Sequence, residues 1–344
     1  MKSGLRKVLF LCAAIVAAVA AVALYTWYAD HRMGNFSRPE KVYVYPGTSA
    51  SEVIGDILSS GSVKRPGSLR RAFNSVFKEG TPEPGYYVFS PSSSSIYAAR
   101  AVRFGWQTPV RMTLSGTIRT KETLARKIAK GMLVDSVSVL SALRDPAFLS
   151  AYGFDTVSVF SLVIPDSYDM KWTASLEDIF ARFKKEYDAF WTPENVRKAK
   201  SAGLTPQEVS VLASIVDGES HYAPELPTIA GVYLNRLAIG MRLQADPTVA
   251  YCFGYRLNRI LERHLSYDSP YNTYMYAGLP PGPISVPPKA CLEAVLNHGS
   301  HNYYYFCASP AMDGSHVFAS GYAEHLVNAR AFQKALNERT KAKK

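Results

Sequence analysis

The sequence predicts an α+β protein with three parts: an N-terminal transmembrane helix, a small α/β module and a larger mixed α+β domain. Three observations lead to this division. An uncharged run covers residues 8–28, short strand and helix patterns alternate over residues 41–108, and from Thr205 onward helical patterns give way to long turn-rich segments. At 344 residues with 47% hydrophobic content, the chain is long enough for each folded part to bury its own core.

The N-terminal segment has the composition of a membrane anchor. Residues 1–7 are basic, residues 8–28 carry no charge, and the far end of this run holds the aromatic residues Tyr25, Trp27 and Tyr28. About 20 apolar residues are needed to cross a bilayer as a helix, and aromatic side chains favour its interfaces. Because positive charge precedes the run, we expect residues 1–7 in the cytoplasm, residues 8–28 in the membrane and the rest outside the cytoplasm.

A cleaved signal peptide is the alternative for this segment. The apolar part of a signal peptide is usually only about 7–15 residues long and ends at a small-residue cleavage site. The sequence shows no convincing site of that kind after residue 28. We therefore expect an uncleaved single-pass anchor in the cell (inner) membrane, followed by a tether over residues 29–40.

Charge and cysteine content limit the partners. The net charge of +11 suits a protein near anionic lipids or polymers. Since the basic residues form no long tract, and an exported domain would not meet nucleic acid, no nucleic-acid partner is expected. Three cysteines follow the anchor, Cys252, Cys291 and Cys307, so at most one disulfide can form among them, and buried thiols are the alternative.

The folded region begins with a module and continues into a larger domain. Residues 41–108 predict, in order, a strand, a turn, two helices, a second strand and another helix. A strand, a Gly-Thr pair and a helix recur from residue 109, which we interpret as a degenerate duplication of a small strand–helix unit. We place the module at residues 41–108 and the larger domain at residues 109–344.

The best-defined predicted helix starts at Thr205. Thr205 is suited to the N-cap, Pro206 to the first helical position, and Glu208 completes a capping box. Helical spacing then separates two neighbouring faces. The apolar stripe contains Val209, Leu212, Val216 and Glu219. The polar stripe contains Ser210, Ser214, Asp217 and His221.

The two acidic residues near the end of this helix are expected to differ. Glu219 occupies a position that the spacing reserves for an apolar residue, so its carboxyl group should lose hydration and its pKa should rise toward the range of a general acid. Asp217 lies on the polar stripe and should stay ionised. The alternative for Glu219 is a frayed helix end, where its side chain turns to water or pairs with Arg236 or Arg242.

Four stretches of the chain resemble the endolytic murein transglycosylase family, also called the YceG-like family. They are "LASIVDGES" (212–220), "AGVYLNRLAIGMRLQADPTVAY" (230–251), "SPYNTYMYAGLPPGPIS" (269–285) and "GSHVFASGYAEH" (314–325). The resemblance implies a single-pass membrane protein with a LysM-like module at residues 41–108. It also implies a YceG-like catalytic domain at residues 109–344, with a lysozyme-like glutamate helix. Such an enzyme cleaves peptidoglycan glycan strands internally, between MurNAc and GlcNAc.

The resemblance also implies roles for individual residues. Lytic transglycosylases use one glutamate followed by a hydroxyl residue, a pattern matched by Glu219 and Ser220, whereas the second glutamate common in the family is replaced by Asp217. Glu219 is thus the expected catalytic residue. The matching stretches hold further expected sugar contacts, namely Ser220, Asn235, Gln244, Tyr271, Asn272 and Tyr274. The alternatives for the contacts beyond Ser220 are structural: a solvated helix face, a braced turn or a core aromatic.

In the implied reaction, one residue acts in turn as acid and base. Glu219 protonates the glycosidic oxygen, then accepts the proton of the MurNAc C6 hydroxyl as that oxygen attacks C1, which leaves a 1,6-anhydroMurNAc end. No cofactor and no metal are expected, because the histidines around Cys307 lack the close His or Cys pairs typical of a zinc site. The chain departs from the family pattern at Phe160-Ser161 and at "LSGT" (114–117), which concerns substrate contacts or partner surfaces.

The expected partners are peptidoglycan glycan strands, the membrane, and peptidoglycan synthases or elongation and division proteins. Through them the enzyme would help to end the elongation of nascent strands. Two alternatives stay open. The chain could be a catalytically inactive peptidoglycan-binding scaffold for wall-synthesis proteins, or a hydrolytic muramidase. A muramidase would need a second carboxylate, for which Asp217 is nearest in sequence but lies on another helical stripe than Glu219.

Overall fold

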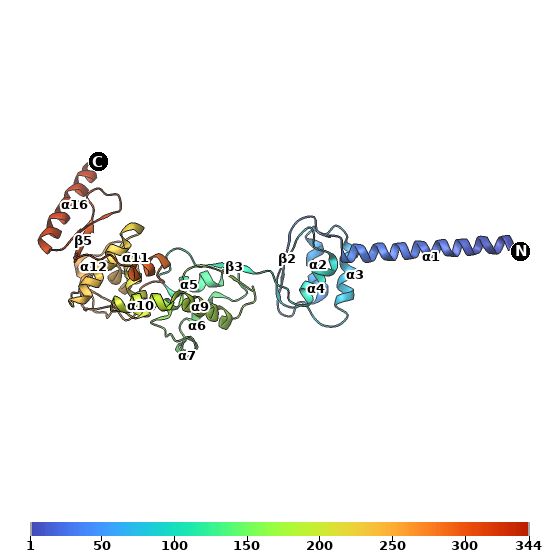
Figure 1. Cartoon of the computed structure of the whole chain (residues 1–344), viewed down its shortest axis with the longest axis horizontal. Coiled ribbons are helices and arrows are strands. Elements are labelled where there is room, and N and C mark those ends of the chain that lie inside the picture. Colours follow the sequence, from blue (N-terminus) through green and yellow to red (C-terminus); the bar gives the residue numbers. More distant parts are fainter. Residues whose placement is uncertain (1, 343–344) are drawn as a thin grey trace. The chain divides into compact units, whose positions relative to one another are not determined.

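The computed structural model describes residues 2–342 (Figure 1). The first residue of the predicted cytoplasmic segment and the last two residues of the predicted catalytic domain lie outside the described residues. The chain forms two compact units. The first contains the chain up to Met112 with Gly131–Leu133 and Tyr168–Ala174, and the second contains Thr113–Lys130, Val134–Ser167 and the chain from Ser175 onward. The mixture of helices and short strands confirms the predicted α+β class.

Helix α1, Lys2–His31, is the first element of the first unit. From Gly4 to His31 it is long and apolar enough to cross a membrane, and its large apolar side chains are exposed. The predicted apolar N-terminal helix is confirmed, and it is longer at both ends than the predicted range of residues 8–28. A helix of this length and composition is compatible with a membrane anchor and with a signal sequence.

A strand, two helices and a second strand follow α1. These elements and the helix after them are β1 Glu40–Val44, α2 Ala50–Ser59, α3 Pro66–Val76, β2 Gly85–Phe89 and α4 Ser95–Arg103. The two strands are antiparallel, with Glu40 opposite Phe89 and Val44 opposite Gly85. Apolar side chains of both helices and both strands form one buried core, which includes Val53, Phe73 and Tyr87. The order of elements agrees with the sequence prediction for this region.

Residues 29–40, predicted as a tether, are packed into the first unit. Phe36 is fully buried in the core of that unit. The side-chain amide of Asn35 donates to the backbone oxygen of Arg65 at 3.1 Å and to Oγ of Ser95 at 2.9 Å. One buried aromatic ring and one amide with distant partners are enough to fix the segment.

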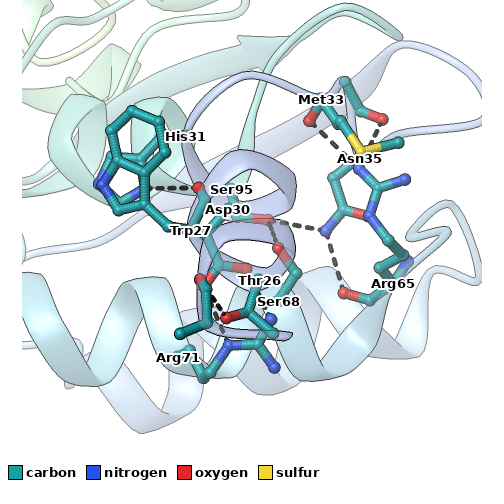
Figure 2. Close-up of polar contacts among 12 residues, drawn as sticks. Thr26, Trp27, Asp30, His31, Met33, Asn35, Arg65, Ser68, Arg71 and Ser95 are labelled. Carbon is teal, nitrogen blue, oxygen red and sulfur yellow. Dashed lines mark hydrogen bonds and ion pairs between the residues drawn. The ribbon is translucent and has the colours of Figure 1, made fainter. Parts of the chain in front are cut away.

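The end of α1 is joined to α3 by an ion pair. Figure 2 shows the Arg71 guanidinium directed at Asp30, with Nε–Oδ2 and Nη2–Oδ1 distances of 2.9 and 2.7 Å. The Asp30 side chain is largely buried, whereas that of Arg71 is half exposed. In the last turn of α1, the rings of Trp27 and His31 stack with their centres 4.8 Å apart. The helix therefore continues into the folded unit without a flexible joint.

The second unit is mostly helical. Its helices are α5 Lys121–Ala129, α6 Ser136–Ala142, α7 Pro146–Ser150, α8 Val159–Leu162, α9 Leu176–Phe190, α10 Pro193–Ser201, α11 Pro206–Glu219, η1 Ala223–Glu225, α12 Leu226–Ala238, α13 Asp246–Cys252, α14 Glu262–Leu265, α15 Lys289–Leu296 and α16 Tyr322–Ala342. Strands β5 Tyr305–Ala308 and β6 His316–Ala319 form an antiparallel pair. Strands β3 Val110–Thr113 and β4 Ser167–Met170 also pair, and the boundary between the units passes through both.

Helix α11 is the centre of the second unit's core and packs against α12 and α15. Its predicted start is confirmed: Thr205 caps the helix, Pro206 is the first helical residue, and Glu208 completes the capping box. All eight residues from Val209 to Val216 are buried, including both serines of the predicted polar stripe. The predicted polar stripe is therefore buried at both serines, whose small hydroxyls can bond to backbone atoms.

The three cysteines after α1 are free thiols. Cys252 and Cys307 are half-buried, and Cys291 is buried in the core around α11. Burial raises the pKa of the Cys291 thiol to about 12. The alternative of buried thiols is the one that the structure supports.

Candidate active site

Glu219 is the last residue of α11, and Tyr233 on the neighbouring α12 faces it. The Tyr233 hydroxyl donates a hydrogen bond to Glu219 Oε1 at 2.6 Å. Tyr233 is itself buried, so its ring has little freedom to move away. The close packing of α11 and α12 therefore places one strong donor against one carboxyl oxygen.

The surroundings of Glu219 raise the pKa of its carboxyl group. Burial of the carboxyl group raises the pKa of Glu219 to about 7, and the negative charge of Asp246 adds to the increase. The hydrogen bond from Tyr233 and the positive charge of Arg236 act in the opposite direction. At neutral pH the group is thus divided between its acid and carboxylate forms, which is the property a general acid and base requires.

Three cavities meet at Glu219. The Arg119 cavity, of 260 Å³, is lined by Arg119, Ser214, Asp217, Asp246, Tyr255 and Ser285 among others. The His325 cavity, of 300 Å³, is lined by Tyr233, Arg236, Gln244, Asp246, Tyr274, Tyr305, Phe306, Tyr322 and His325. The Met312 cavity, of 700 Å³, is lined by Ser220, His221, Tyr222, Met312, His316, Phe332 and Leu336 among others. Glu219 lines all three, so an extended ligand can pass its carboxyl group on more than one side.

Asp217 does not match its predicted environment. It is half-buried, and burial raises its pKa, while the charges of His221 and Arg119 act in the opposite direction. It also lines the Arg119 cavity together with Glu219. The helical stripes predicted different faces for the two acids, but this cavity extends around the end of α11 and reaches both.

Two of the predicted sugar contacts lie in the His325 cavity. They are Gln244 and Tyr274, and the Tyr274 hydroxyl donates to Asp246 Oδ1 at 2.7 Å. Ser220 is buried and lines the Met312 cavity, where its Oγ accepts a hydrogen bond from the backbone of Tyr222 at 3.0 Å. The structure thus brings three of the six predicted contacts next to Glu219.

The other three predicted contacts hold loops together. The Asn235 amide donates to the backbone oxygens of His301 and Tyr303, both at 2.9 Å. Asn272 is fully buried, and its side-chain amide donates to the backbone oxygens of Leu265 and Tyr267. The Tyr271 ring packs on that of Tyr251 at 4.5 Å. The packing of Tyr271 matches its alternative as a core aromatic, whereas Asn235 holds a loop in place of the solvated helix face that was its alternative.

The arginines proposed as alternative partners of Glu219 have other contacts. Arg236 is buried and donates to the backbone oxygens of Tyr304 and Leu243, at 2.7 and 2.5 Å. Arg242 donates to the backbone oxygen of Tyr274 at 3.1 Å. Among the side chains that the structure describes, neither forms an ion pair with Glu219.

Sequence reasoning missed four residues of the site: Tyr233, Asp246, Arg119 and His325. Tyr233 looks like a core residue by periodicity, and Asp246 looks like part of a turn before Pro247. Arg119 reaches the site from far earlier in the chain, where its guanidinium lies 4.7 Å from the centre of the Tyr255 ring. No local pattern brings these residues together. Tyr233, Asp246 and His325 lie within the stretches that resemble the family. Membership of these stretches was the signal that could have pointed to them.

Comparisons with known proteins identify the family to which the chain is similar. The sequence profile of the YceG-like family matches residues 42–331. A Bacillus subtilis (strain 168) protein named endolytic murein transglycosylase is 33% identical over 165 residues, which cover 48% of this chain and 45% of that protein. A protein of the same name from Streptococcus pneumoniae serotype 2 is 29% identical over 324 residues, which cover 85% of this chain and 58% of that protein. The chain spans about half the length of the curated relatives it matches.

A solved structure supports the fold. A crystal structure described as a YceG-like protein from Listeria monocytogenes aligns with a TM-score of 0.55 at 27% sequence identity. The alignment covers 84% of this chain and 98% of that protein. The similarity therefore extends over most of both chains.

Proposed function

The chain belongs to the YceG-like family, and we propose that it is a lytic transglycosylase that cleaves peptidoglycan glycan strands internally. The observation that carries the proposal is Glu219, a carboxyl group with a pKa of about 7 at the meeting point of three cavities. A polymer that lies across this point extends beyond Glu219 on both sides. Such an arrangement favours cleavage within a strand rather than only at its end.

The reaction needs one group that first gives and then takes a proton. Protonated Glu219 donates to the glycosidic oxygen between MurNAc and GlcNAc, and the C1–O bond breaks. The C6 hydroxyl oxygen of MurNAc then attacks C1 and gives its proton to the Glu219 carboxylate. The products are a 1,6-anhydroMurNAc end and a new GlcNAc end, and Glu219 is protonated again.

Tyr233 is the positioning residue in this scheme. Its hydroxyl donates to Oε1 of Glu219 at 2.6 Å, which fixes the orientation of the carboxyl group. The hydrogen bond also stabilises the carboxylate form that serves as base, so it keeps the pKa of Glu219 from rising further. Burial and Tyr233 together set the balance between the two protonation states.

A hydrolytic muramidase is the second candidate, and one observation favours it. Asp217 and Asp246 both line the Arg119 cavity with Glu219. Glycoside hydrolases typically use two carboxyl groups, one as acid and one as base or nucleophile. The name of the curated relatives, endolytic murein transglycosylase, favours the lytic reaction over this alternative.

Digestion of purified peptidoglycan tests the proposal. The protein should release muropeptides with anhydro ends, Glu219→Gln should release none, and Glu208→Gln, on the exposed first turn of α11, should behave like the unaltered protein. Mass spectrometry distinguishes anhydro from reducing ends by the mass of one water. Reducing ends would support the muramidase, and equal release by Glu219→Gln would remove Glu219 from the mechanism. Binding of peptidoglycan without release would support the scaffold.

We also propose that α1 is an uncleaved anchor in the cell (inner) membrane. The support is the ion pair between Asp30 and Arg71 and the burial of Ala29, because a cleavage near residue 30 would remove part of the folded unit. In this topology residues 1–7 are cytoplasmic and both folded units are extracytoplasmic. Retention of the full-length mass in the membrane fraction would agree, whereas a mature form starting near residue 30 would contradict the anchor.

Residues 41–108 of the first unit are proposed to form a LysM-like module that binds glycan strands. The strand–helix–helix–strand order of β1, α2, α3 and β2 supports this assignment. The proposed role of the whole protein is to end the elongation of nascent strands, in contact with peptidoglycan synthases or with elongation and division proteins. Pull-down of the first unit on purified peptidoglycan tests the binding part of this proposal.

A further inference from the structure

A polar cavity lies in the first unit where α1 ends. This Arg32 cavity, of 450 Å³, is lined by His31 and Arg32 at the end of α1, by serines of the loop over residues 90–94 and by Tyr97 of α4. It shares no lining residue with the three cavities around Glu219. Its volume is within the range of about 300–1,000 Å³ that is typical of small-molecule sites.

The serine loop is fixed against the chain that leaves α1. A Cβ added to Gly34 would lie 2.2 Å from the backbone oxygen of Pro91, so the two segments approach each other backbone to backbone. Such an approach leaves room only for glycine. The backbone N–H of Asn35 also donates to the oxygen of Ser93 at 2.8 Å. The wall that carries the serines is therefore held in place beside the end of α1.

Arg32 supplies an unpaired positive charge. Its side chain is exposed and forms no ion pair with any residue that the structure describes. The neighbouring acid, Asp30, is already paired with Arg71. Among the described residues that line the cavity there is no carboxylate. A guanidinium without an acid beside it favours an anionic ligand.

Three serine hydroxyls add hydrogen-bond donors. Oγ of Ser90 lies 2.8 Å from Oγ of Ser92 and 3.3 Å from Oγ of Ser93. Oγ of Ser93 also accepts a hydrogen bond from the backbone N–H of Ser90 at 3.0 Å. Two bonds among three hydroxyls use two of the three hydroxyl protons, so the third is available to a ligand. Guanidinium and hydroxyl groups are common donors to phosphate oxygens.

The position of the cavity along α1 indicates where the ligand comes from. His31 is three residues beyond Tyr28, the end of the predicted span, and a helix rises about 1.5 Å per residue, so His31 lies about 4.5 Å past the hydrocarbon edge. The headgroup layer on each side of a bilayer is about 5–8 Å thick. Trp27, whose exposed ring stacks on that of His31 (Figure 2), is a residue type that favours this layer. The cavity thus lies at the depth of lipid phosphate groups.

We propose that the Arg32 cavity binds the phosphodiester headgroup of an anionic phospholipid, through the Arg32 guanidinium and the hydroxyls of Ser90 and Ser92. The proposal rests on the proposed membrane anchor. A soluble phosphate ester offers the same oxygens, but the lipid is favoured because the membrane presents its phosphates at the depth of the cavity. A bound headgroup would attach the first unit to the membrane surface at a second point besides α1.

Native mass spectrometry of the full-length protein in a non-ionic detergent tests the proposal. The probes are phosphatidylglycerol and phosphatidylcholine with the same short acyl chains. Phosphatidylglycerol should bind at least about fivefold more tightly, because its headgroup has a net negative charge and that of phosphatidylcholine has none. Arg32→Gln should weaken the binding of phosphatidylglycerol about fivefold, the equivalent of about 1 kcal/mol. The double variant Ser90→Ala/Ser92→Ala should weaken it at least about threefold.

Controls separate a defined site from general attraction to a basic surface. Arg38→Gln removes the same charge from an exposed arginine of the first unit that does not line the cavity, and it should bind phosphatidylglycerol like the unaltered protein. The thermal midpoints of all variants should agree. Equal losses in Arg38→Gln and Arg32→Gln, or equal binding of the two lipids, would overturn the proposal. Binding of glycerol 3-phosphate as tight as that of the lipid would make a soluble phosphate the ligand and would also overturn it.

The lipid site and the proposals around it fail in different ways. If the full-length mass stays in the membrane fraction while the two lipids bind equally, the lipid site is wrong and the anchor stands. A mature form that starts near residue 30 would contradict both. Arg32→Gln in detergent should digest peptidoglycan like the unaltered protein, so the catalytic role of Glu219 is tested independently of the lipid site.

Discussion

The hydrogen bond from Tyr233 to Glu219 gives the sharpest quantitative prediction. Tyr233→Phe removes the donor that lies 2.6 Å from Oε1 and leaves the ring in place. A hydrogen bond to a charged group contributes about 1.5–3 kcal/mol, and one pKa unit corresponds to about 1.4 kcal/mol. Because the protonated acid also retains part of this bond, we expect the lower end of the range. The pKa of Glu219 should therefore rise by about one unit from its value of about 7.

The pH profile of kcat/KM on soluble glycan strands measures this shift. Glu219 must be protonated to act as general acid, so activity falls as the pH rises through its pKa, and the alkaline limb should move about one unit upward in Tyr233→Phe. Tyr87→Phe is the matched control, since it removes a tyrosine hydrogen bond of 2.7 Å in the first unit. An unchanged alkaline limb, or a shift to lower pH, would refute the assigned role of Tyr233.

Three further predictions concern the same features. The raised pKa of Glu219 should cost the unaltered protein stability as pH rises from 4.5 to about 7, because the carboxyl group ionises more easily in the unfolded chain than in the folded one. Glu219→Gln lacks this loss, so its stability relative to the unaltered protein should increase over that range, by at most about 3 kcal/mol. Thermal unfolding measures the difference, and a difference that stays constant with pH would contradict the raised pKa. Gly218→Ala should lower kcat/KM at least about tenfold with little loss of stability. The new Cβ would lie 2.5 Å from Cβ of Pro247, so α13 would have to move away from Glu219. Full activity of the variant would show that α13 adjusts without disturbing Glu219. Arg71→Ala should destabilise the first unit by about 1–2 kcal/mol by leaving Asp30 without its partner, and urea unfolding that matches the unaltered protein would count against a fixed junction.

Local signals in the sequence predicted local structure well. The start of α11 was predicted to the residue, because Thr205, Pro206 and Glu208 each act on the backbone within one turn. The raised pKa of Glu219 was predicted from its place on the apolar stripe, and the structure agrees. Both inferences depend only on helix geometry and the cost of burying a charge.

Long-range contacts were the part that the sequence could not supply. Ser214 was predicted on the polar stripe, but nothing in the sequence indicated that its hydroxyl accepts a hydrogen bond from the backbone of Ile284, 70 residues away, at 3.0 Å. Asp217 was predicted to point away from Glu219, but a cavity shared with Arg119 and Asp246 joins them. Within the predicted tether, the burial of Phe36 likewise depends on partners outside the segment. Periodicity describes one helix, and it says nothing of what packs against each face.

Isotope incorporation tests the central claim, that Glu219 acts alone and that the attacking oxygen comes from the sugar. Peptidoglycan is digested in H₂¹⁸O, and the new ends are examined by mass spectrometry. In a lytic reaction the C6 oxygen of MurNAc closes onto C1, so the products should carry 1,6-anhydro ends without ¹⁸O. New reducing ends that contain one ¹⁸O atom would show that water is the nucleophile and would contradict the account.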